Sequence, residues 1–238
     1  MAKPPLCIDL YCGLGGWADG FLAEGYDVVG FDIERQDYGS GGYPGQLVLQ
    51  DVLTLHGEHF RSAAIIVASP PCQFFSRMAM PFKMPWSQEE FERRKKLALS
   101  LYWSCFRIAH EAGVPLIVEN VAGAQKWVGR SRFVYGSFHL WGDVPALMPS
   151  TQSDGVKVPS DCGRRTDPGK EARFTTRDCG AEGLKFGGGW WKDSTNNLIR
   201  KASSRSSARK AASAMIAKIP FPLAQHIARV FKNDFIHT

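Results

Sequence analysis

The stretch LCIDLYCGLGG, residues 6–16, decides the fold of this 238-residue chain. Its first six residues are mostly apolar and predict a short buried strand, Leu6–Tyr11, while the glycines behind it predict a tight turn. A helix is predicted from Trp17 to Glu24. A strand, a glycine-rich turn and a helix form the unit that cradles nucleotides in α/β proteins, because glycines let the backbone approach a ligand.

Further apolar segments along the chain predict more strands, and helical segments separate them. A long helix, Gln88–Ala112, is predicted because Ser87 is a favourable N-cap and Gly113 a favourable residue beyond its end. The alternation predicts an α/β fold with a mainly parallel, doubly wound sheet and helices on both faces. The expected strands are Asp27–Asp32, Gln46–Gln50, Ala64–Ala68, Pro115–Val118 and Phe133–Trp141.

Two reactive side chains follow strands of this predicted sheet. Residues 69–76 read SPPCQFFS, and the two prolines stiffen a turn that presents Cys72 just beyond a strand. Glu119 follows the strand Pro115–Val118, so both side chains are expected at the sheet edge where α/β proteins bind ligands. A thiol beside a carboxyl group indicates a nucleophile and a proton donor. The alternatives are a structural cysteine and a solvated loop acid.

Together and in this order, these segments resemble the DNA (cytosine-5) methyltransferase family. Residues 9–16 resemble its cofactor motif, Pro71–Ser76 its nucleophile loop, Glu119–Val121 its glutamate motif and Ile219–Ala228 its closing motif. The resemblance covers residues 6–145 and 210–232. It implies a Rossmann-like S-adenosylmethionine-dependent methyltransferase fold with a small irregular recognition insert. It also implies methyl transfer from S-adenosylmethionine to C5 of a flipped-out cytosine in DNA.

The resemblance assigns roles to individual residues. Cys72 would add to C6 of the cytosine, Glu119 would hydrogen-bond N3, and Arg132 would clamp the base or Glu119. The expected cofactor contacts are Tyr11, Gly13, Gly15, Gly16, Asp32, Ile33, Asp51 and Val52. The expected DNA contacts are Gln73, Ser76, Arg130, Arg164 and Arg165.

The family pattern also implies a division of the chain. Residues 1–150 would form the catalytic and cofactor-binding domain, 151–201 a small target-recognition region, and 202–238 a C-terminal segment that returns to the catalytic domain. Two motifs depart from the pattern. The Arg-x-Arg that ends at Arg132 lies nearer to Glu119 than the family's Gln-x-Arg-x-Arg, and Ile216-Ala217 replaces the usual Gly-Asn pair.

The connection Ser69–Trp86 contains methionines and aromatic residues, among them Met78, Phe82 and Met84. One interpretation is a loop that packs over the core. The other is a mobile lid that closes over an extruded base.

Charge and composition favour a nucleic-acid partner. The net charge is +6, although the first 60 residues hold nine acidic and only two basic residues, so basic charge collects in the later chain. No apolar run reaches the roughly 20 residues that a membrane span requires, and no membrane partner is expected. The six cysteines lack metal-ligand spacing. We therefore expect no metal site and a reduced, cytoplasmic, monomeric protein.

Three other functions compete with DNA methylation. An RNA cytosine-5 methyltransferase would share the chemistry, and a catalytically silent nucleic-acid-binding relative would fit the altered motifs. A nucleotide dehydrogenase is disfavoured because Ala18 stands where the dinucleotide pattern has its third glycine.

Overall fold

The computed structural model describes residues 3–36, 42–79, 86–149, 214 and 217–236. Its strands are β1 Leu6–Leu10, β2 Asp27–Asp32, β3 Gln46–Leu49, β4 Ile65–Ala68, β5 Leu116–Asn120, β6 Phe133–Tyr135 and β7 Phe138–Gly142. Its helices are α1 Gly16–Ala23, α2 Gln73–Met78, α3 Gln88–Ala112, α4 Gln125–Val128 and α7 Phe221–Ile236. Three 3-10 helices are η1 Val52–Thr54, η2 Gly57–Phe60 and η3 Ala122–Ala124.

The seven strands form one sheet in the order β3-β2-β1-β4-β5-β7-β6. The first five strands of the chain pair in parallel, and the hairpin of β6 and β7 extends the sheet antiparallel beyond β5. Helical segments follow β1, β3 and β4 and return the chain for the next parallel strand. The predicted α/β fold with a mainly parallel sheet is confirmed.

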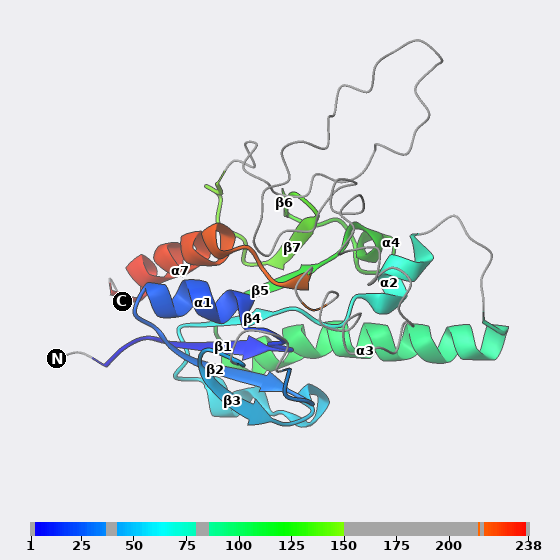
Figure 1. Ribbon diagram of the computed structural model, residues 1–238, viewed down its shortest axis with the longest axis horizontal. Helices are drawn as coiled ribbons and strands as arrows, with labels where there is room; N and C mark the ends of the chain where they lie inside the picture. Colours follow the sequence, from blue (N-terminus) through cyan, green and yellow to red (C-terminus); the bar gives the residue numbers. More distant parts are fainter. Residues whose placement is uncertain (1–2, 37–41, 80–85, 150–213, 215–216, 237–238) are drawn as a thin grey trace, which may run out of the picture.

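Helices cover both faces of the sheet, with α3 on one face and α1 and α7 on the other (Figure 1). Alternating residues of β1 feed the two layers: Ile8 and Leu10 pack in the cluster that includes α3, and Cys7 in the cluster that includes α1 and α7. All four residues of β4 are buried. A central parallel strand is covered on both faces, which explains its continuous apolar run.

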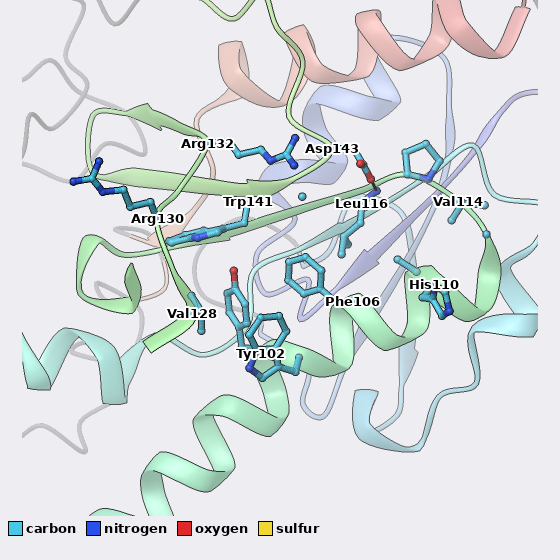
Figure 2. Close-up of a pocket in the computed structure, with 15 residues that line it drawn as sticks. Tyr102, Phe106, His110, Val114, Leu116, Val128, Arg130, Arg132, Trp141 and Asp143 are labelled. Carbon is cyan, nitrogen blue, oxygen red and sulfur yellow. Dashed lines mark hydrogen bonds between the residues drawn. The ribbon is translucent and has the colours of Figure 1, made fainter. Parts of the chain in front are cut away.

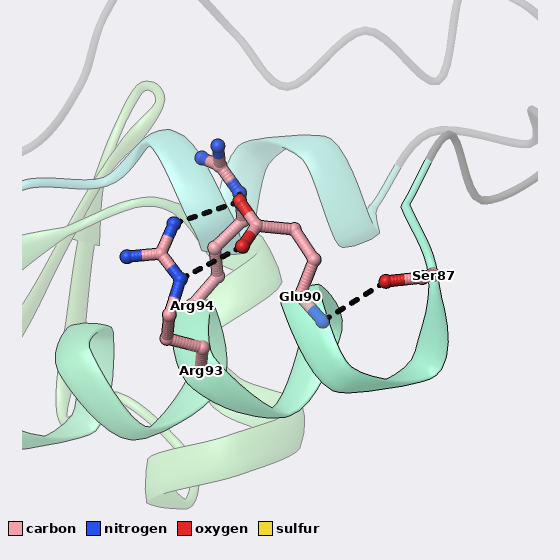
Figure 3. A network of polar contacts seen from close by, with 4 residues as sticks. All are labelled: Ser87, Glu90, Arg93 and Arg94. Carbon is pink, nitrogen blue, oxygen red and sulfur yellow. Dashed lines mark hydrogen bonds and ion pairs between the residues drawn. The ribbon is translucent and has the colours of Figure 1, made fainter.

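Helix α3 begins and ends where the sequence predicts. The Ser87 side chain accepts a hydrogen bond from the Glu90 backbone N–H at 3.2 Å, and Gly113 takes the left-handed conformation at φ 70°. In the first turns the Glu90 carboxylate accepts hydrogen bonds from Arg93 and Arg94 (Figure 3). These hydrogen bonds lower the pKa of Glu90 to about 2, and the bond from Arg93 has the largest effect.

The C-terminal helix α7 packs closely on α1. A Cβ atom at Gly20 would collide with Ala224, so the two helices approach nearer than a side chain would allow. The Tyr26 hydroxyl donates to the carbonyl oxygen of Ala228 at 3.0 Å, and Glu24 accepts from Arg229 at 2.8 Å. This close packing brings the C-terminal helix α7 against α1, the first helix of the chain.

One expectation about local structure was wrong, and one helix was not predicted. Residues 133–141 form a hairpin and not one strand, because Gly136, at φ 61°, reverses the chain between β6 and β7. The connection Ser69–Trp86 begins with a helix, α2, whose Phe74 and Phe75 are buried. Phe74 stacks on Trp86 at a ring distance of 6.3 Å, which matches a segment packed on the core. Residues 80–85, with Phe82 and Met84, lie outside the described residues.

Candidate active site

The carboxyl ends of the parallel strands bring most of the expected site residues to one edge of the sheet. Leu10 of β1 pairs with Phe31 of β2 and with Ala68 of β4, and Ala68 pairs with Val118 of β5. The glycine turn, Asp32, the cysteine loop and Glu119 therefore follow aligned strand positions. Sequence alone predicted this arrangement, since parallel strands end at a common edge.

The turn after β1 depends on unusual backbone angles. Tyr11, Gly13 and Gly15 have φ values of 57°, 50° and 73°. A Cβ atom at Gly15 would collide with Cδ of Pro44, and one at Gly16 would collide with the backbone of Ile219. A Cβ atom at Gly13 would meet nothing nearer than 3.9 Å. Gly15 and Gly16 thus pack against the protein itself, and only Gly13 borders open space.

Asp32 closes this turn at the end of β2. Its Oδ2 accepts a hydrogen bond from the Gly13 backbone N–H at 3.0 Å, and its Oδ1 accepts from the Ile33 N–H at 2.8 Å. The side chain of Ile33 is 72% exposed, which is unusual for so large an apolar group. An exposed apolar side chain beside a carboxylate suits the flat base and the ribose of a nucleoside.

The remaining expected cofactor contacts differ in accessibility. Asp51 is exposed, and its Oδ1 accepts from the Leu53 backbone N–H at 2.9 Å, while Val52 is fully buried. The Tyr11 hydroxyl lies 2.9 Å from Ser104 Oγ on α3. Tyr11 therefore connects the turn to α3 by its hydroxyl, and its contact with adenine stays a prediction.

The loop that carries Cys72 is fixed by three hydrogen bonds. The Ser69 N–H donates to Leu10 O at 3.1 Å, Trp17 Nε1 donates to Ser69 Oγ at 3.0 Å, and Asn120 Nδ2 donates to Pro70 O at 2.9 Å. Cys72 then precedes the first residue of α2 and is half-buried. The loop is thus tied to β1, α1 and β5 before the thiol is presented.

Cys72 differs from the other cysteines that the structure describes. Cys7, Cys12 and Cys105 are buried. Burial raises the pKa of all three thiols, that of Cys105 to about 12. A thiol must ionise to attack an electrophile, so these three are poor nucleophiles. Among the described cysteines, only Cys72 combines partial exposure with a position at the carboxyl edge.

Glu119 lies inside β5, one residue beyond the strand end that the sequence predicted. It is 6% exposed and pairs with Leu140 of β7, and Asn120 beside it is 1% exposed. Neighbouring residues of a strand point to opposite faces, so Glu119 and Asn120 leave β5 in opposite directions. Asn120 reaches the cysteine loop on its side. The role of Glu119 as a proton donor stays a prediction.

The expected nucleic-acid contacts are distributed unevenly. Gln73 is exposed and Ser76 half-buried, both on α2 directly after Cys72. Arg130 and Arg132 are exposed and line a hollow on the α3 side of the sheet, where Arg132 extends toward Asp143 (Figure 2). Arg164 and Arg165, like the rest of the expected recognition region, lie outside the described residues.

Arg132 is not grouped with Glu119 by the strand register. Phe133 of β6 pairs with Leu140, which in turn pairs with Glu119, so these three share one face of the sheet. Arg132, one residue earlier, is directed to the opposite face and borders the hollow together with Trp141. A contact between Arg132 and Glu119 stays a prediction, and the strand register places the two residues on opposite faces of the sheet.

Sequence reasoning missed a buried pair beneath the glycine turn. The Tyr43 hydroxyl donates to Asp9 Oδ2 at 3.0 Å, and Asp9 is fully buried. Burial is the main cause that raises the pKa of Asp9 well above its usual range, and the charges of Asp32 and Asp19 raise it further. The signal was available in the sequence, because a lone acid in the middle of an apolar strand requires a partner.

Within the described residues, no group of three or more His, Cys, Asp or Glu side chains is arranged to hold a metal ion. The same part of the chain contains no helix that is long and apolar enough to cross a membrane.

Comparison with family models gives a match to more than half of the chain. Residues 6–129, more than half of the chain, match the C-5 cytosine-specific DNA methylase family. A comparison with curated proteins gives no significant match.

Similarity to solved structures is weak. The methyltransferase EhMeth of Entamoeba histolytica is 16% identical, with 54% of this chain and 41% of that chain covered and a TM-score of 0.38. A DNMT2 mutant from Spodoptera frugiperda is 19% identical, with 52% and 38% covered and a TM-score of 0.33. Dnmt2 of S. pombe is 18% identical, with 53% and 37% covered and a TM-score of 0.33. The matched part spans about two fifths of the length of these proteins.

Proposed function

Because the chain belongs to the C-5 cytosine-specific DNA methylase family, we propose that it methylates C5 of a flipped-out cytosine in DNA through a covalent bond to Cys72. The observation that carries the proposal is the hydrogen bond from Asn120 Nδ2 to Pro70 O, at 2.9 Å. It ties the loop that precedes Cys72 to β5, the strand that carries Glu119, at the carboxyl edge of the sheet.

The proposed chemistry follows from the low nucleophilicity of cytosine C5. Addition of the Cys72 thiolate to C6 forms an S–C bond and moves the electrons of the C5–C6 double bond to C5. Glu119, buried at the same edge, would hold a proton at N3 and stabilise this adduct. After methylation, loss of the C5 proton and departure of the Cys72 thiolate restore the double bond.

S-adenosylmethionine would supply an electrophilic methyl group on a sulfonium centre. The turn after β1 fits such a group, because Gly13 leaves open space where a Cβ atom would stand. Ile33 offers an exposed apolar surface for adenine, with Asp32 beside it and Asp51 at the next strand end. Gly15 and Gly16 would hold the shape of the turn, because their own surroundings are filled by Pro44 and Ile219.

The target base would leave the duplex to reach Cys72. Flipping a stacked base costs a few kcal/mol, and side chains beside the nucleophile compensate by contacting the opened strand. Gln73 and Ser76, one and four residues after the thiol, suit that role. Arg164 and Arg165 would contact DNA from the recognition region. The protein would act in a reduced, cytoplasmic setting.

A trapping experiment tests the proposal. DNA with 5-fluorocytosine and labelled S-adenosylmethionine should give a covalent complex with the wild-type protein, because fluorine cannot leave as a proton does. Cys72→Ala should abolish both the complex and methyl transfer, while Cys105→Ala, a buried thiol in the core, should form the complex as the wild type does. A complex that persists in Cys72→Ala would contradict the nucleophile. Methyl transfer to matched RNA but not to DNA would contradict the substrate.

A further inference from the structure

A hollow of about 730 Å³ lies on the α3 side of the sheet, outside the proposed active site. Its floor is formed by Tyr102 and Phe106 of α3, and Trp141 of β7 stands above them between Arg130 and Arg132 (Figure 2). The volume falls within the roughly 300–1,000 Å³ that small-molecule pockets occupy. The size therefore admits a ligand as large as a nucleotide.

The chemistry of the lining combines an aromatic surface with positive charge. Trp103 lines the hollow and is 48% exposed, although Tyr102 and Phe106 each pack against its ring at 5.3 Å, so part of an indole is accessible on α3. Arg130 and Arg132, both exposed, contribute two guanidinium groups. The carboxylate of Asp143 is occupied in part, since its Oδ2 accepts from the Leu116 backbone N–H at 2.9 Å. Flat bases stack on tryptophan, and guanidinium groups bind phosphate.

The backbone beneath both arginines is fixed. Trp141 Nε1 donates to the carbonyl oxygen of Gly129 at 3.0 Å, directly before Arg130. The Arg132 backbone N–H donates to Leu140 O at 2.8 Å. A site whose cations stand on anchored backbone loses less entropy when it binds a charged ligand.

The hollow connects to the nucleophile helix through α4. The ring of Trp127 in α4 lies 5.4 Å from that of Phe74, which is two residues after Cys72. Val128, the next residue, already lines the hollow, and Arg130 follows it. Val128 and Arg130 therefore place one end of the hollow beside the helix that packs on α2. A nucleic-acid strand that presents a base to Cys72 would pass α4 to reach this end.

We propose that this hollow binds one nucleotide of the substrate strand other than the target, with its base on Trp103 and its phosphate on Arg132. The inference rests on the nucleic-acid substrate of the proposed function. A free nucleotide presents the same base and phosphate, and the experiment distinguishes the two sources.

The test measures binding of a fluorescein-labelled single-stranded DNA of 12 nucleotides by anisotropy (a length of about 12 covers one module). Trp103→Ala should weaken binding about 5- to 160-fold, the equivalent of one stacked base. Leu97→Ala is the matched control, because Leu97 is 49% exposed on the same helix and does not line the hollow. Arg132→Ala should weaken binding and reduce its salt dependence, unlike Arg61→Ala, which removes an exposed arginine that does not line the hollow.

The source of the nucleotide is tested by photo-crosslinking of the same DNA carrying 5-iodouracil. We expect a crosslink at Trp103 that excess CMP or AMP does not prevent. If micromolar CMP or AMP prevents the crosslink, the hollow binds a free nucleotide and not a nucleotide of the substrate strand. If Trp103→Ala and Arg132→Ala both bind the labelled DNA with wild-type affinity, the hollow does not bind a nucleotide. If the nucleotide site is wrong, the covalent complex of Cys72 with 5-fluorocytosine still forms. If the proposed function is wrong, that complex is lost and the anisotropy result is unchanged.

Discussion

The turn after β1 and the loop after β4 lie side by side at the carboxyl edge, yet they are held by different means. The turn depends on backbone conformation: Tyr11, Gly13 and Gly15 all have positive φ. No residue from Ser69 to Cys72 has a positive φ; there two prolines and hydrogen bonds from Trp17 and Asn120 fix the chain. The turn should therefore be sensitive to changes within itself, and the loop to changes in its partners.

The first prediction contrasts two glycines of the turn. Gly15→Ala should lower the free energy of unfolding by about 2–5 kcal/mol, because the left-handed conformation disfavours a Cβ atom and Pro44 fills its space. Gly13→Ala should lower it by only about 1–2 kcal/mol, since nothing lies within 3.9 Å except Gln36 Oε1 at that distance. Chemical denaturation measures both.

Calorimetry with S-adenosylmethionine completes this contrast. Gly13→Ala should weaken cofactor binding in a protein that remains folded, because its methyl group enters the open space of the turn. Equal cofactor affinity in Gly13→Ala and wild type would place the cofactor elsewhere.

The second prediction concerns a partner of the loop. Asn120→Asp replaces the donor that faces Pro70 O by an oxygen, and leaves a buried carbonyl group without its hydrogen bond. We expect a loss of about 1–3 kcal/mol in stability and a lower rate of adduct formation by Cys72, with cofactor affinity unchanged. Gln50→Glu, an exposed amide-to-acid change, is the control. An unchanged rate of adduct formation would show that the loop holds itself.

The third prediction concerns Asp9 beneath the turn. Because burial raises its pKa, the folded protein holds this proton more tightly than the unfolded chain. The contribution of Asp9 to stability is therefore present below about pH 4 and is lost as the pH rises toward the raised value. Asp9→Asn should become more stable relative to wild type between pH 4 and pH 8, as measured by thermal unfolding. A difference that is constant with pH would mean that Asp9 is ionised in the folded protein.

The smallest effect is expected at Tyr102, a buried residue beneath the hollow and away from both segments. The Tyr102 hydroxyl is buried and has no hydrogen-bond partner among the described residues. Tyr102→Phe should therefore change stability by less than about 1 kcal/mol, with a gain expected, because no hydrogen bond is lost. A loss of stability larger than about 1 kcal/mol would indicate that the Tyr102 hydroxyl forms a hydrogen bond with a bound water. The variant sets the scale on which the changes at Gly15 and Asn120 are judged.

Local sequence determined much of this fold. The buried runs of β1, β4 and β5, the glycines of the first turn, and the two ends of α3 at Ser87 and Gly113 were predictable. The caps and the glycine turn follow from the backbone preferences of neighbouring residues. The apolar runs could be recognised because strands in a parallel sheet are covered on both faces. The common edge of Cys72 and Glu119 follows from the same rule.

Tertiary structure decided what each of these residues contacts. Gly15 is an expected cofactor contact, and the structure adds that Pro44, distant in sequence, fills the space beside it. The pairing of β6 with β7 directs Arg132 to the α3 side and away from Glu119. Asn120, and not a residue of the loop, fixes Pro70. Such contacts join residues distant in sequence, so only the folded chain determines which face a side chain takes and what packs against it.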